Sequence, residues 1–92
     1  MSKKELFHTR LIELEEGSYD VLYQKKRYLL SKQTQLEGKL VKLYAEELGD
    51  NDFISLNYYT NIKGGLLKPC EMPEEKVIDF VLNFKKISKY CV

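Results

Sequence analysis

The chain has 92 residues, 15 of them basic and 14 acidic, and its formal net charge is +1. This length predicts a single domain over residues 1–92, with one modest hydrophobic core and no room for a deep substrate cavity. The near-neutral balance gives no long-range attraction to nucleic acid or to anionic membranes, although a local patch stays open as an alternative. No apolar run reaches membrane-spanning length and no secretory signal is evident, so we expect a cytoplasmic protein without membrane contact.

The first elements along the chain are predicted to be strands. Alternating apolar residues over 6–14 predict a first strand, and residues 19–33 predict a hairpin with Lys25-Lys26 as its turn. A two-residue loop at that position sets Tyr23 opposite Tyr28, which is a stabilising aromatic cross-strand pair.

The meander is predicted to continue to about residue 68. Two strong turn signals bracket residues 39–47, which favours a strand there over the helix that the same spacing also permits. Residues 53–59 predict the next strand, and a short extended segment follows the turn at Gly64-Gly65. The sheet is therefore expected to span about residues 5–68.

The apolar period changes at Pro73, where steps of three and four residues replace the alternation. Proline suits a first helical position, and the acidic Glu74 and Glu75 suit the positive end of a helix dipole. A helix over about residues 73–90 is predicted, with Phe84 in the middle of its apolar stripe. The predicted fold is α+β: an antiparallel five- or six-stranded meander sheet with one C-terminal helix packed on one face.

No catalytic constellation is found in the sequence. His8 is the single histidine, and no serine or cysteine in register with it completes a dyad. Gly64-Gly65 lacks the frame of a phosphate-binding loop. We therefore predict that the protein is not an enzyme and uses no cofactor.

Metal and redox chemistry find no support in the sequence either. Cys70 and Cys91 match no metal-ligand spacing, and the four acids at 46, 47, 50 and 52 lack the pattern of a calcium loop. Cys70 lies between prolines and is interpreted as a packed, inert thiol, with an exposed reactive thiol as the alternative. A Cys70–Cys91 disulfide would require export, which nothing in the chain indicates.

The remaining candidate is one face of the predicted sheet. Alternation places one set of side chains under the helix: Val21, Tyr23, Tyr28, Leu30, Val41, Leu43, Ile54 and Leu56. The opposite face is then polar, partly basic and aromatic, and includes Gln24, Ser31 and Ser55. Its predicted binding residues are Arg27, Lys42, Tyr44, Asn57 and Tyr59.

Three interpretations of this face compete. Tyrosine and arginine are enriched at protein interfaces, aromatic and basic groups on an open sheet also bind single-stranded nucleic acid, and tyrosine is common on solvated sheets. The sequence favours a small non-enzymatic module that binds a protein partner or itself through the open sheet face. The alternative is a nucleic-acid-binding domain that uses the same aromatic and basic face.

Overall fold

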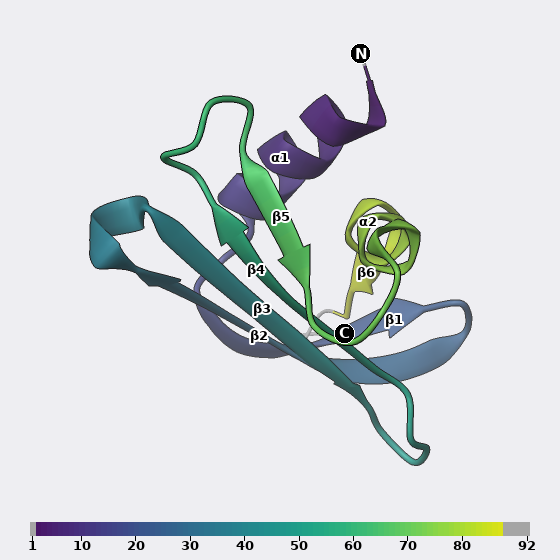
Figure 1. The fold of residues 1–92 in the computed structure, drawn as a ribbon. Coiled ribbons are helices and arrows are strands. Elements are labelled where there is room, and N and C mark those ends of the chain that lie inside the picture. The colour runs from purple at the N-terminus through teal and green to yellow at the C-terminus, as the bar shows by residue number, and fades with distance from the viewer. Residues whose placement is uncertain (1, 88–92) are drawn as a thin grey trace.

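The computed structural model describes residues 2–87, and it confirms the α+β class. Its elements are α1 (Lys3–Glu13), β1 (Gly17–Tyr23), β2 (Lys26–Gln35), the 3-10 turn η1 (Leu36–Gly38), β3 (Leu40–Glu47), β4 (Phe53–Tyr59), β5 (Leu66–Pro69), α2 (Glu74–Asn83) and β6 (Lys85–Lys86). The six strands form one antiparallel sheet in the order β5-β4-β3-β2-β1-β6, and both helices lie on the same side of it (Figure 1). Neither of the two helices in residues 2–87 is long and apolar enough to cross a membrane.

The predicted first strand is wrong, because this segment forms helix α1. The side chain of Ser2 caps the helix by accepting a hydrogen bond from the Glu5 amide at 3.2 Å, as in a capping box. Phe7 and Leu11, four residues apart, are buried against the sheet, whereas Leu6 remains 43% exposed. The helical period of Phe7 and Leu11 therefore decides the conformation, and the apparent alternation through Leu6 does not.

The hairpin is confirmed, but its turn lies one residue earlier than predicted. Gln24 and Lys25 both adopt positive φ, +50° and +65°, which is the backbone of a type I′ turn. Tyr28 consequently pairs with Val21 and not with Tyr23, so the predicted cross-strand pair is wrong. The register differs by two residues, which keeps every side chain on its predicted face, and the rings of Tyr23 and Tyr28 still meet edge-on at 5.9 Å.

The later strands agree with the prediction. Residues 40–47 are strand β3 and not the alternative helix, β4 is found where expected, and β5 includes the extended segment at 66–68. All eight side chains predicted to lie under a helix are buried. The sheet therefore has one apolar face, and α1 and α2 both pack against it.

Helix α2 begins at Glu74, so Pro73 is its N-cap residue and not its first helical residue as predicted. It ends at Asn83, so the predicted extension to about residue 90 is wrong. Phe84 adopts an extended backbone, and Lys85–Lys86 then pair with β1 as the edge strand β6. Two backbone carbonyls at the C-terminal end of α2 are hydrogen-bonded by a side chain of α1. The guanidinium of Arg10 donates to the carbonyls of Val81 and, at 2.5 Å, Phe84. The remaining part of the predicted helix, from residue 88 onward, lies outside the described residues.

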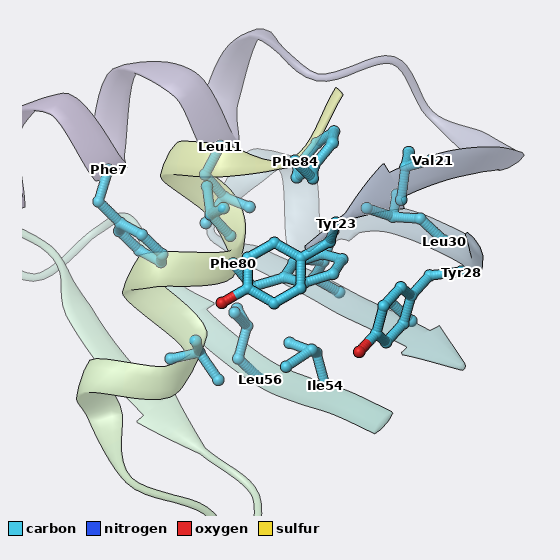
Figure 2. Close-up of a cluster of buried hydrophobic side chains, with 14 of the residues drawn as sticks. Phe7, Leu11, Val21, Tyr23, Tyr28, Leu30, Ile54, Leu56, Phe80 and Phe84 are labelled. Atoms are coloured by element: carbon cyan, nitrogen blue, oxygen red, sulfur yellow. The ribbon is translucent and has the colours of Figure 1, made fainter. Parts of the chain in front are cut away.

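Phe80 lies at the centre of the core (Figure 2). Its ring centroid lies 4.9 Å from that of Tyr23, 5.3 Å from that of Tyr28 and 5.3 Å from that of Phe84. These are the separations at which aromatic pairs add to the energy of simple burial. An aromatic cluster thus joins α2 to the β1–β2 hairpin.

A buried lysine on β2 satisfies the end of α1. Lys32 is only 3% exposed, and its ammonium group donates to the carbonyls of Ile12 at 3.1 Å and Leu14 at 2.7 Å. Burial lowers the pKa of Lys32, and the carboxylate of Glu16, 3.7 Å away, acts in the opposite direction. Each helix therefore has its C-terminal carbonyls bound by a cation from another element.

Two phenols at the edge of the core are held by carboxylates. The Tyr28 hydroxyl donates to Asp52 at 2.6 Å, and the Tyr23 hydroxyl donates to Asp79 on α2. Asp52 also accepts from Lys76 at 2.6 Å. Burial raises the pKa of Asp52, but the hydrogen bonds from Lys76 and Tyr28 outweigh it and leave this pKa below its ordinary value.

Replacing Arg10 by alanine should destabilise the protein by about 1.5–3 kcal/mol, because two helix carbonyls then lose a charged donor. The guanidinium also lies 4.8 Å from the centroid of the Phe84 ring, so packing is lost with the charge. Urea unfolding measures the change, with Arg27→Ala on the exposed sheet face as the control, expected within about 0.5 kcal/mol of the parent. Equal unfolding midpoints for the two variants would show that Arg10 does not stabilise the end of α2.

Asp52 should contribute to stability in a pH-dependent way. Because its folded-state pKa is depressed, its stabilisation is complete above the unfolded pKa of about 4 and is lost as the pH falls through the folded value. Asp52→Asn should therefore be less stable than the parent at pH 7, and the gap should close in acid. Lys76→Met, which removes one donor to this carboxylate, should flatten the same dependence; a gap that stays constant down to pH 2 contradicts this assignment.

Candidate functional site

The five predicted binding residues all belong to the sheet face that neither helix covers. Arg27, Lys42 and Tyr44 are exposed, and Asn57 and Tyr59 are half-buried. Their neighbours on the other face of the same strands form the core. The alternation of β2, β3 and β4 is therefore what presents all five side chains on one side.

Three of the five lie together in a shallow hollow of about 400 Å³ on this face. Lys42 and Asn57 are directly opposite on β3 and β4, and Tyr44 is the next residue along β3 on the same side. The rest of the lining consists of Ser31, Gln33, Leu43, Ser55, Leu56 and Cys70. The hollow offers hydroxyl, amide and ammonium groups, which can hold polar groups of a bound macromolecule.

Arg27 and Tyr59 lie apart from this hollow. Arg27 is opposite Leu22 at the hairpin end of the sheet, and Tyr59 is opposite Leu40 and Leu66 at the other end of β4. The five predicted residues consequently share a face but do not converge on one small ligand. A site that uses all of them must contact an extended surface.

An apolar strip on the same face is absent from the prediction. Four of its side chains remain between 39% and 46% exposed: Leu22, Leu29, Tyr44 and Leu48. The fifth, Phe53, is half-buried, and its ring stacks on Tyr44 with centroids 6.3 Å apart and an interplanar angle of 26°. We name these five residues the apolar strip. The alternation within each strand places residues 22, 29, 44 and 53 on the same face, so the sequence predicts the apolar strip once the face covered by the helices is known.

Charges of both signs are interleaved with the apolar strip. Glu46 lies on β3 between Leu29 on β2 and Phe53 on β4. Arg27 is opposite Leu22, and its carbonyl accepts a hydrogen bond from the Leu48 amide at 2.8 Å. The apolar strip and the charges beside it thus form an amphipathic surface and not a purely basic one.

The other residues singled out in the sequence have structural surroundings. Glu46 and Glu47 point to opposite faces of β3, and Asp52 is held by Tyr28 and Lys76. Cys70 is half-buried and its amide donates to the carbonyl of Ser55, while Cys91 lies outside the described residues. Within residues 2–87, no three histidine, cysteine or acidic side chains are placed to hold a metal ion.

Comparison of the chain with protein-family models, with curated proteins and with solved structures finds no match.

Proposed function

We propose that this protein is a small non-enzymatic interaction module that binds a protein surface through the open face of its sheet. The observation that supports it is the apolar strip, in which Tyr44 stacks on Phe53 beside exposed leucines on a face without a covering helix. A solvated antiparallel face normally carries polar side chains, whereas contiguous apolar patches are typical of contact sites. Tyr44 is the expected centre of the contact, because exposed aromatic residues contribute strongly to protein binding.

The charges around the apolar strip favour a protein over a nucleic acid. The carboxylate of Glu46 lies in the middle of the strip, where it would repel a phosphate backbone. Arg27 supplies the opposite sign nearby, so a partner with one acidic and one basic group is matched. A second copy of the chain meets this requirement, since it carries both Glu46 and Arg27 beside the same apolar strip.

A nucleic acid is the second candidate, and a separate part of the face favours it. Lys42 and Lys68 lie on the two sides of Asn57 in one row across β3, β4 and β5, next to Tyr44. Two ammonium groups beside an aromatic ring are suited to a phosphate backbone and a stacked base. Titration with single-stranded oligonucleotides at two salt concentrations tests this candidate, because such binding weakens steeply with salt.

The test of the proposed function is a matched set of photo-cross-linking variants in the cells that make the protein. A photoreactive phenylalanine analogue replaces Tyr44 in one variant and the exposed Ile12 of α1 in the other, and a denaturing gel with mass spectrometry identifies the adducts. We expect a discrete protein adduct, or a cross-linked dimer, from position 44 and not from position 12.

Leu29→Ser in the position-44 variant should abolish that adduct, because it interrupts the apolar strip next to the cross-linker. Its unfolding free energy should remain within about 0.5 kcal/mol of the parent, as is usual for an exposed residue. Equal adducts from positions 44 and 12, or adducts only to nucleic acid, would contradict the proposal.

A further inference from the structure

A second hollow, of about 460 Å³, lies beside α1 and shares no lining residue with the apolar strip. It is bounded by the first turns of α1 and by the loop between β4 and β5. Its volume falls within the roughly 300–1,000 Å³ range of small-molecule sites. Its lining residues are Lys4, Glu5, His8, Thr9, Thr60, Asn61, Ile62, Lys63, Gly64 and Gly65.

The imidazole of His8 is held in a fixed orientation within this hollow. Its Nδ1 lies 2.5 Å from the hydroxyl oxygen of Tyr58, which is only 3% exposed, and the two rings meet edge-on at 5.5 Å. Gly65 closes over the phenol so tightly that a side chain at this position would overlap the hydroxyl. His8 is half-buried and lines the hollow, so the ring edge that carries Nε2 is the one left for a ligand.

The tautomer of His8 follows from the same contact. Burial raises the pKa of Tyr58, so the phenol keeps its proton at neutral pH. We assign the phenol as the donor of this hydrogen bond, because His8 is its one side-chain partner among the described residues, and Nδ1 accepts the bond only when it is unprotonated. Neutral His8 therefore carries its hydrogen on Nε2 and presents a donor to the hollow.

Side-chain donors line the hollow on both the helix and the loop. Lys4 is four residues before His8 and lies on the same face of α1, and Lys63 comes from the opposing loop. Thr9, Thr60 and Asn61 add hydroxyl and amide groups. The one acid of the lining, Glu5, accepts from Ser2 at 3.4 Å. The hollow is thus rich in donors and cations.

We propose that this hollow binds the phosphoryl group of a small phosphorylated metabolite. The three terminal oxygens of a phosphate monoester match Lys4, Lys63 and Nε2 of His8, since charge-assisted hydrogen bonds from separate directions hold such a group. The rest of the hollow, with Asn61 and the two threonines, suits a hydroxyl-bearing body such as a sugar. This site is independent of the apolar strip and of the partner that binds there.

Titration of the full chain with glucose 6-phosphate at constant ionic strength, followed by NMR, tests the proposal. We expect saturable shifts of the Gly64, Gly65 and Thr9 amides, and none with glucose. Lys63→Ala should weaken binding at least about fivefold, because one charge-assisted hydrogen bond is lost at a partly exposed site. Lys85→Ala, the same charge change at the exposed edge strand β6 and outside the lining of the hollow, should alter binding less than about twofold.

Tyr58→Phe separates a defined site from general attraction between charges. It leaves the net charge unchanged but removes the hydrogen bond that orients His8, so affinity should fall at least about threefold while the amide spectrum stays dispersed. The proposal is overturned by the absence of saturation, by equal losses for Lys63→Ala and Lys85→Ala, or by equal shifts with glucose. Phosphatidic acid also has a phosphate monoester as its headgroup. Binding only to vesicles that contain this lipid would equally overturn the proposal that the ligand is a small soluble metabolite.

Discussion

The hydrogen bonds from Arg10 to the last carbonyls of α2 are the interaction on which the arrangement of this fold depends. They connect the first helix to the second across most of the sequence, and they fix where the second helix ends. Because α2 ends at Asn83, the chain returns at once to the sheet and adds β6 to the edge of β1. A longer helix would leave that part of the edge strand without a partner.

The placement of the two helices explains why the sheet has one open face. An arginine on α1 reaches the carbonyls of α2 because the two helices are neighbours, and both then cover the same apolar side chains. In a sheet of six strands this arrangement leaves the second face without a layer of its own. The apolar strip around Tyr44 lies on that second face, and its exposure is a direct consequence of the placement of the helices.

The sequence predicted the sheet well because residue alternation decides it. In β3, charged and polar residues alternate with Val41, Leu43 and Ala45. The turns on both sides of this segment favour a short strand over a helix. The same reasoning failed over residues 6–14, where Leu6 and Ile12 fit an alternating pattern although Phe7 and Leu11 determine the packing. The Ser2–Glu5 capping box was the available signal for a helix at this point.

The end of α2 and the phosphate site could not be predicted, because both depend on contacts between distant segments. Nothing near Asn83 indicates that Arg10 will bind its neighbouring carbonyls. Likewise, His8 and Tyr58 are 50 positions apart, and only the folded chain brings the imidazole and the phenol together. The binding face was predicted as a set of residues, but its apolar strip required knowledge of which face the helices cover.

The most direct test of this account is the solvent accessibility of the two sides of β3 in the free protein. Relaxation enhancement by a soluble gadolinium chelate, measured by NMR in a dilute sample, reports it for each side chain. Strong enhancement is expected at Lys42, Tyr44 and Glu46 and weak enhancement at Leu43 and Ala45, with Tyr44 and Glu46 becoming protected when the partner is added. Protection of Tyr44 equal to that of Leu43 in the dilute, isolated protein would contradict it, because the face proposed for binding would then already be covered.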